Sequence, residues 1–236
     1  MKAILFDFGG TLDTDGIHWS ENYWDAYEIF NVSITKQQYE ESYIFSENNM
    51  AGKVKTGDSF SATLKYQITL QIEYLTNKNY LHHSLKDNLI EKIHKRCISE
   101  VLENVEIVKR ILLNLRTDYL LGVVSNFYGN LDFILRDLRL RNLFDILIDS
   151  TLVGVKKPDP QIFQIALDRI GVTPPDTIVI GDSYDRDIQP AKILGCTTIW
   201  LDGKSWIKPK ETTKADYKII SLKEVENILV AIKQRK

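Results

Sequence analysis

The fold is decided by the first twelve residues, Met1-Lys2-Ala3-Ile4-Leu5-Phe6-Asp7-Phe8-Gly9-Gly10-Thr11-Leu12. The apolar run from Ala3 to Phe6 predicts a buried strand, and a carboxylate, Asp7, follows it directly. An acid at the carboxyl end of a buried strand points into the crevice where open α/β sheets bind ligands. Gly9 and Gly10 let the backbone approach a ligand and offer N–H groups to an anion. An ordinary surface turn fits this stretch equally well. The rest of the chain must therefore decide between a surface turn and a ligand-binding site.

The composition is typical of a soluble globular protein. The chain has 236 residues, of which 44% are hydrophobic and 26% are charged, and its formal net charge is -2. This balance gives no reason to expect nucleic acid or a membrane as partner. No apolar run approaches the ~20 residues of a membrane span, and the N-terminus does not fit a signal peptide. Cys97 and Cys196 match no metal-binding spacing, so we expect packed thiols and a cytoplasmic protein.

Residues 14–98 predict helices and no buried strand, because apolar and aromatic side chains recur at helical spacing. The four predicted helices carry Tyr23, Trp24, Tyr27 and Phe30; Tyr39 and Tyr43 after a capping box at Thr35 and Gln38; Phe60, Leu64, Ile68 and Leu75; and Leu85, Leu89 and Ile93 after a cap at Ser84. Four helices of this length form a small bundle, and we expect their aromatic side chains mostly in its core.

After about residue 100, helices alternate with short apolar strands. We predict strands at 119–124, 146–148, 177–180, 198–201 and 216–220, and helices at 105–115, 131–138, 159–170, 187–194 and 222–232. This alternation predicts a doubly wound, Rossmann-like parallel sheet covered on both faces, which the strand before Asp7 must join. The predicted domains are therefore an α/β core formed by residues 1–13 and 99–236, and an inserted α-helical bundle formed by residues 14–98.

Polar side chains follow the second, third and fourth predicted strands. Ser125 and Asn126 follow the second strand, and a hydroxyl and an amide there can hold an anionic group. Lys157 follows the third strand and precedes a proline that rigidifies the backbone, whereas its neighbour Lys156 is expected in solvent. Asp182, together with Asp187, follows the fourth strand.

These positions converge on one edge of a parallel sheet, beside Asp7. Several carboxylates at such short distances repel one another unless a cation is present. Mg²⁺ prefers oxygen ligands and commonly uses one or two carboxylates together with substrate phosphate. The sequence therefore predicts a Mg²⁺ site next to a group that binds phosphate.

With these four segments in order, the chain resembles the haloacid dehalogenase (HAD) superfamily. Asp7-x-x-Gly10-Thr11-Leu12 is similar to the first motif of that family, Ser125 to the second, Lys157-Pro158-Asp159-Pro160 to the third, and Gly181-Asp182-Ser183-x-x-x-Asp187 to the fourth. The helical insertion resembles the cap that the family places after its first motif.

The resemblance implies a role for each motif residue. Asp7 is expected to attack phosphorus and form an aspartyl-phosphate that water then opens. Mg²⁺ is expected on Asp7, the carbonyl of Gly9 and Asp182, with Asp187 in support. Ser125 and Lys157 are expected to act in catalysis and to contact the phosphoryl oxygens. Gly10, Thr11 and Asn126 complete the predicted set of substrate-binding residues.

The chain departs from the family pattern at Gly9, where family phosphatases usually carry a second aspartate. That aspartate serves as general acid and base, which contributes about 10²–10⁴-fold in rate. A phosphatase lacking it could use Asp13, Asp15 or His18 instead. Two other readings stay open. One is an enzyme that cleaves a C–P bond, for which Lys53 or Lys55 would form a Schiff base. The other is a catalytically weak or non-enzymatic protein that binds phosphorylated ligands or a partner.

The favoured interpretation is a Mg²⁺-dependent hydrolase of the phosphatase type. Its substrate is expected to be a small phosphorylated metabolite; the motifs describe the chemistry at phosphorus and do not indicate the leaving group. The helical cap is expected to close over Asp7, exclude water and supply side chains that recognise the substrate.

Overall fold

A computed structural model describes residues 1–206, 209 and 214–234 of the chain. The strands are β1 (Ala3–Phe6), β2 (Leu120–Ser125), β3 (Ile146–Asp149), β4 (Thr177–Gly181), β5 (Thr197–Leu201) and β6 (Tyr217–Ile219). They form one sheet in the order β3-β2-β1-β4-β5-β6, and all neighbouring pairs are parallel. The predicted parallel sheet is confirmed, and each predicted strand begins and ends within one residue of the observed one.

The strand before Asp7 lies at the centre of this sheet. Phe6, its last residue, pairs with Val123 of β2 on one side and with Ile180 of β4 on the other. The chain runs outward from β1 in both directions, and such a reversal opens a crevice at the carboxyl ends of the strands. Asp7 follows β1 and therefore enters that crevice.

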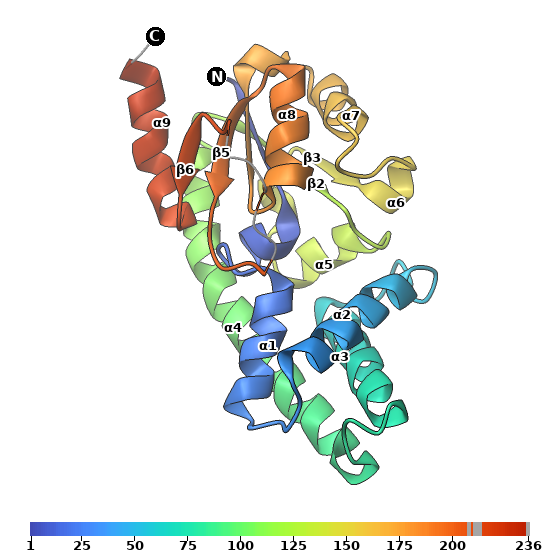
Figure 1. Cartoon of the computed structure of the whole chain (residues 1–236). Coiled ribbons are helices and arrows are strands. Elements are labelled where there is room, and N and C mark those ends of the chain that lie inside the picture. Colours follow the sequence, from blue (N-terminus) through green and yellow to red (C-terminus); the bar gives the residue numbers. More distant parts are fainter. Residues whose placement is uncertain (207–208, 210–213, 235–236) are drawn as a thin grey trace.

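Both faces of the sheet are covered by helices, because successive side chains of a buried strand point to opposite sides. Ile4 and Phe6 of β1 pack with apolar residues of one set of helices, whereas Leu5 packs with those of the other set. The first set comprises α4 (Lys86–Leu115), α5 (Leu131–Asp137) and α9 (Val225–Gln234); the second comprises α7 (Gln161–Ile170) and α8 (Gln189–Leu194) (Figure 1). This arrangement confirms the predicted doubly wound core.

The helical insertion consists of α1 (Trp19–Ile29), α2 (Lys36–Met50), α3 (Phe60–Asn77) and the first half of α4. In Figure 1 it lies below the sheet, and α4 runs from it up along the core. Its aromatic stripe is core, as predicted, since Tyr23, Tyr27 and Tyr39 are almost completely buried. The predicted capping box at the start of α2 is also present, with Thr35 as N-cap and Gln38 as its partner.

The two helices predicted on either side of residue 100 are in fact one. Helix α4 runs unbroken for 30 residues, and its buried positions continue at helical spacing through Cys97, Val101 and Val105. No glycine or proline lies within it, so nothing in its sequence ends the helix. Ser84 does not cap it either, because Ser84 lies in a separate 3₁₀ turn. The proposed domain boundary at residue 98 falls inside this helix, and the division stays a prediction.

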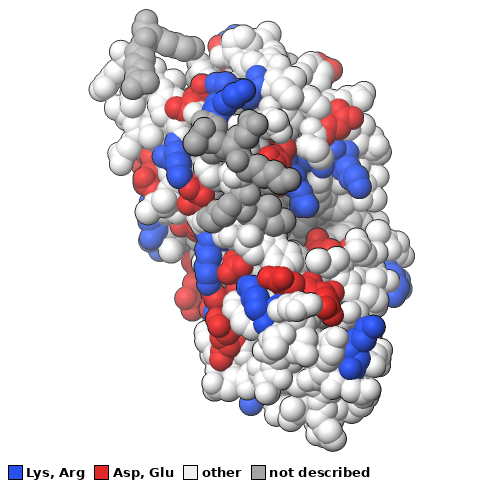
Figure 2. All heavy atoms as spheres, in the orientation of Figure 1, with Lys and Arg blue, Asp and Glu red and all other residues white. Residues whose placement is uncertain are grey.

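Charge and cysteines agree with the expectations from composition. The face in Figure 2 mixes acidic and basic side chains, as the near-neutral net charge predicts. Cys97 and Cys196 are buried and unpaired, and burial raises the pKa of Cys97 to about 12 and that of Cys196 to about 11. Among the described residues, no helix combines the length and the apolar character needed to cross a bilayer.

Candidate active site

The turn after β1 brings Asp7 against the loop that follows β4. Residues Phe8–Leu12 form a turn whose backbone is not helical at Gly9 and Gly10, and Gly10 adopts a left-handed conformation, with φ at 89°. A Cβ atom at Gly10 would overlap the carboxylate of Asp182. Gly10 is therefore required both by its backbone conformation and by the close approach of Asp182.

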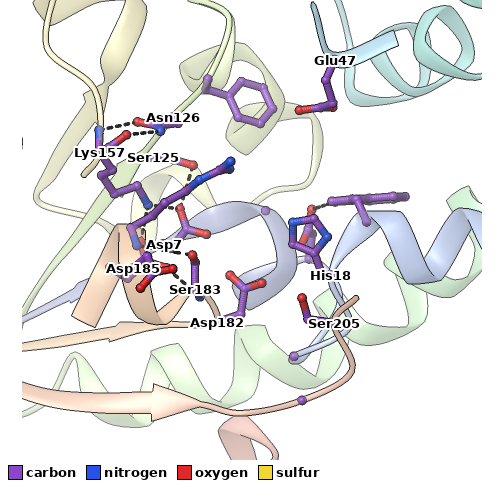
Figure 3. Close-up of a pocket in the computed structure, with 18 of the residues that line it drawn as sticks. Asp7, His18, Glu47, Ser125, Asn126, Lys157, Asp182, Ser183, Asp185 and Ser205 are labelled. Carbon is purple, nitrogen blue, oxygen red and sulfur yellow. Dashed lines mark hydrogen bonds and ion pairs between the residues drawn. The ribbon is translucent and has the colours of Figure 1, made fainter. Parts of the chain in front are cut away.

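A buried ion cluster holds the carboxylate of Asp7. The ammonium of Lys157 lies 2.5 Å from Oδ1 of Asp7 and 2.5 Å from Oδ1 of Asp187. The hydroxyl of Ser125 donates to the same Oδ1 of Asp7 at 2.9 Å. Figure 3 shows Ser125 and Lys157 directed at Asp7, with Asp182 on the other side of the pocket floor. The structure thus brings together the nucleophile, hydroxyl, lysine and acids predicted from the sequence.

The charges of this cluster do not balance without a cation. Burial lowers the pKa of Lys157, but attraction to Asp187 and Asp7 outweighs burial and raises it. Burial and the neighbouring Asp7 and Asp187 raise the pKa of Asp182 well above its ordinary value. Burial likewise raises the pKa of Asp187 to about 6, although Lys157 opposes the shift. One ammonium therefore leaves three carboxylates undercompensated.

The same residues suit a hard divalent cation. Asp7, Asp182 and Asp187 can each present a carboxylate oxygen within 4.8 Å of the others. Carboxylate oxygens are the ligands that Mg²⁺ prefers, and its charge would stabilise all three groups in their ionised form. Gly9, predicted to contribute its carbonyl, lines the cavity beside Asp7. The donor set and its excess of negative charge fit a bound Mg²⁺.

Two of the predicted substrate-binding residues are engaged in holding the site together. The hydroxyl of Thr11 accepts from the backbone N–H of Asp182 at 3.1 Å, and Thr11 itself is fully buried. The side-chain amide of Asn126 donates to the carbonyl of Lys157 at 2.9 Å and accepts from its N–H at 2.8 Å. Both residues position their neighbours, and their contact with a substrate stays a prediction.

A cavity of about 500 Å³ opens above Asp7, between the core and the helical insertion. The insertion contributes aromatic and polar side chains to its wall, and Figure 3 shows Glu47 of α2 across the pocket from Asp7. Burial raises the pKa of the Glu47 carboxyl, which accepts a hydrogen bond from Gln67 of α3. Sequence reasoning missed the wall residues Trp19, Glu47, Gln67, Tyr128, Arg186 and Trp206. No spacing or motif assigns these side chains to the cavity: Trp19, Glu47 and Gln67 are placed by the packing of the insertion, and the other three by the loops that follow β2, β4 and β5.

The fold and this site belong to a known class of enzymes. The family model described as haloacid dehalogenase-like hydrolase matches residues 1–195 of the chain. The chain therefore belongs to the haloacid dehalogenase-like hydrolases, as the four ordered motifs predicted, and it is a hydrolase.

Individual relatives match parts of the chain. It is 43% identical over 83 residues to haloacid dehalogenase-like hydrolase domain-containing protein 3 of Mus musculus, which covers 35% of this chain and 33% of that protein. It is 33% identical over 97 residues to glyceraldehyde 3-phosphate phosphatase of Methanocaldococcus jannaschii, which covers 41% and 42%. The matches thus span between a third and a half of the length of these relatives.

Solved structures match the chain over nearly its whole length. YfnB of Bacillus subtilis, solved bound to magnesium, aligns with a TM-score of 0.61 and 21% identity, covering 97% of this chain and 98% of that one. This likeness supports the fold.

Proposed function

We propose that the protein is a Mg²⁺-dependent phosphatase that hydrolyses a small phosphate monoester through an aspartyl-phosphate on Asp7. The observation that carries this proposal is the environment of the Asp7 carboxylate. Lys157 and Ser125 both bind its Oδ1, which fixes the orientation of the carboxylate and leaves Oδ2 for attack on phosphorus.

The residues around Asp7 suit a two-step displacement. Asp7 attacks phosphorus and the ester oxygen departs; water then opens the aspartyl-phosphate and regenerates the carboxylate. Lys157 and Ser125 lie where they can bind the phosphoryl oxygens as negative charge develops. When bound by Asp7, Gly9 and Asp182, with Asp187 in support, Mg²⁺ supplies the positive charge that lets two anions meet.

The substrate is proposed to be a small phosphorylated metabolite. The cavity of about 500 Å³ lies within the range typical of small-molecule sites. Two relatives are named glyceraldehyde 3-phosphate phosphatase and phosphoserine phosphatase, and both names describe small phosphate monoesters. These two compounds are the first substrates to test.

The alternative of C–P bond cleavage finds little support in the cavity. The lysines considered for a Schiff base, Lys53 and Lys55, are exposed and lie outside the cavity wall. Among the described residues of the cavity wall, Lys157 is the only lysine, and its ammonium already forms ion pairs with Asp7 and Asp187.

Phosphate release tests the proposal. Glyceraldehyde 3-phosphate, phosphoserine and p-nitrophenyl phosphate are incubated with the native protein in Mg²⁺ or in EDTA. We expect phosphate release in Mg²⁺ but not in EDTA. In Asp7→Asn we expect the rate of phosphate release to fall on the order of 10⁴-fold or more. Asp168→Asn, an exposed aspartate on α7 outside the cavity, is the control for the change of charge and should keep native activity.

Other outcomes would select another function. Turnover that survives in Asp7→Asn would exclude Asp7 as nucleophile. A silent native protein that becomes active as Gly9→Asp would show an intact site that lacks a proton donor. Silence of both, with Mg²⁺-dependent binding of a phosphorylated ligand, would indicate a binding protein.

A further inference from the structure

An alkyl phosphate cannot be cleaved efficiently unless a proton reaches the departing oxygen. Gly9 has no side chain to deliver it. A Cβ atom built on Gly9 would meet the edge of the Trp19 indole, with Cδ1 at 3.8 Å and Nε1 at 4.0 Å. The space beside Gly9 is therefore bordered by the N–H edge of this indole.

That indole N–H leads directly to a carboxyl group. Trp19 donates from Nε1 to Oδ2 of Asp13 at 2.8 Å, and the backbone N–H of Gly10 donates to Oδ1 of Asp13 at 2.7 Å. Asp13 thus lies in the cavity wall next to the backbone of residues 9 and 10, only 1% exposed. The carboxyl group missing at Gly9 has a counterpart four residues further along the chain.

Burial allows Asp13 to carry a proton, against the hydrogen bonds that it accepts. It takes hydrogen bonds from two neutral donors, the N–H groups of Gly10 and Trp19, while the hydroxyl of Thr14 donates at 2.6 Å to the carbonyl of Ile17; the charged group that acts on Asp13 is the negative Asp7. Burial is the main reason that its pKa rises to about 7; the hydrogen bonds from Trp19 and Gly10 oppose this shift, and Asp7 adds to it. A carboxyl buried in the cavity wall in this way can both give and take a proton near neutral pH.

The two other candidates of this segment have different tasks. Asp15 accepts from the hydroxyl of Ser221 at 2.7 Å and from the N–H of Leu222 at 2.6 Å, so it joins the segment to the C-terminal helix. His18 uses Nδ1 to cap α1 through the N–H of Ser20. Burial lowers the pKa of His18 to about 4, so its imidazole is neutral at pH 7.

We propose that Asp13 is the general acid and base of this enzyme, in place of the carboxyl group that Gly9 lacks. The proposal rests on the phosphatase activity inferred above. As Asp7 bonds to phosphorus, the P–O bond to the alcohol breaks and its electron pair goes to the departing oxygen, which takes the proton of Asp13. The Asp13 carboxylate then takes a proton from water as that water attacks phosphorus. The P–O bond to Asp7 breaks, phosphate leaves and Asp13 is protonated again.

The leaving group distinguishes an acid from a structural residue. 2,4-Dinitrophenolate departs without a proton, whereas an alkoxide requires one. For Asp13→Asn we expect kcat/KM to fall by about 10²–10⁴-fold on glycerol phosphate but little on 2,4-dinitrophenyl phosphate. Gly9→Asp introduced into Asp13→Asn should restore a large part of the activity on glycerol phosphate.

A buried aspartate outside the cavity is the matched control. Asp149 accepts backbone N–H bonds from Gly129 and Thr151 and is 2% exposed. Asp149→Asn should lower the melting temperature while the ratio of activities on the two esters stays native.

Three results would overturn the assignment of Asp13 while leaving the phosphatase in place. These are an equal loss on both esters, no loss on either, and a leaving-group dependence that appears in His18→Gln instead. A native protein that releases phosphate from neither ester would overturn the phosphatase itself, and the assignment with it.

Discussion

Gly10 makes room for the Asp182 carboxylate while it holds a left-handed backbone. Gly10→Ala should therefore displace Asp182 from the metal site in addition to straining the turn. We expect Mg²⁺ to raise the melting temperature of the native protein but not that of this variant, as measured with and without Mg²⁺. The expected strain in the turn alone is about 1–2 kcal/mol.

Gly171 provides the matched control for that prediction. It is also left-handed, with φ at 74°, but a Cβ atom there would meet no atom within 4 Å. Gly171→Ala should lower the melting temperature through strain and keep the full Mg²⁺ effect. An equal Mg²⁺ effect in Gly10→Ala and Gly171→Ala would contradict the close approach of Asp182.

At the scale of residues, the sequence predicted the polar residues around Asp7 but not the side chains of the insertion that line the rest of the cavity. Asp7, Ser125, Lys157 and Asp182 come directly after strands or precede a helix, so parallel pairing alone brings them together. Glu47 lies on a helix of the insertion, where only the packing angle decides whether it faces the cavity. That angle depends on many distant contacts and leaves no local pattern.

At the scale of elements, α4 joins the helical insertion to the core. Its buried side chains pack with residues of both parts, and Asn104 near its middle donates to the carbonyl of Leu12 at 3.2 Å. Glu103→Pro should break the helix at this junction and destabilise the protein by about 3 kcal/mol or more, because a backbone hydrogen bond is lost and the ring clashes. Urea unfolding followed by circular dichroism measures the loss.

Glu103→Ala separates the helix break from the loss of the side chain. Glu103 is exposed, so the alanine variant should unfold near the native midpoint. If the proline variant unfolded there as well, α4 would not be a continuous structural element.

The boundary of this helix shows where sequence reasoning fails for elements. The strands were predicted closely because each is a short apolar run between turn residues. The division near residue 100 followed a change from aromatic-rich helices to alternating helices and strands. The helical stripe through Cys97, Val101 and Val105 crosses that point without a stop signal. Helix α4 packs in the insertion at its start and against the sheet at its end, and this change of packing partners was mistaken for a boundary between two helices.

At the scale of the whole molecule, the excess of buried carboxylates ties stability to pH and to metal. Burial raises the pKa of Asp13 to about 7 and that of Asp182 well above its ordinary value. Folded protein then keeps protons that the unfolded chain has already lost near pH 4. In EDTA we expect the free energy of unfolding to fall as pH rises from about 4 to 7, by on the order of 1 kcal/mol per pH unit.

Mg²⁺ should reduce this decline, because the cation compensates the carboxylates of Asp182 and Asp187 in place of protons, whereas the part that comes from the burial of Asp13 remains. Urea unfolding at several pH values, with Mg²⁺ or with EDTA, measures both effects. Asp182→Asn should make the decline in EDTA less steep and abolish the response to Mg²⁺. His18, whose pKa is lowered to about 4, opposes this decline below about pH 6.5, because the unfolded chain there binds a proton that the folded imidazole does not. Stability that rises with pH in EDTA would contradict the prediction.

The central position of β1 has a consequence for biosynthesis. Its two neighbours, β2 and β4, begin only at Leu120 and Thr177, so β1 emerges from the ribosome long before either partner exists. The helices between them can form earlier, since their contacts are local. Asp7 is made almost first, yet it gains a working environment almost last. A nascent chain therefore stays inert until translation has passed β4 and its acidic loop.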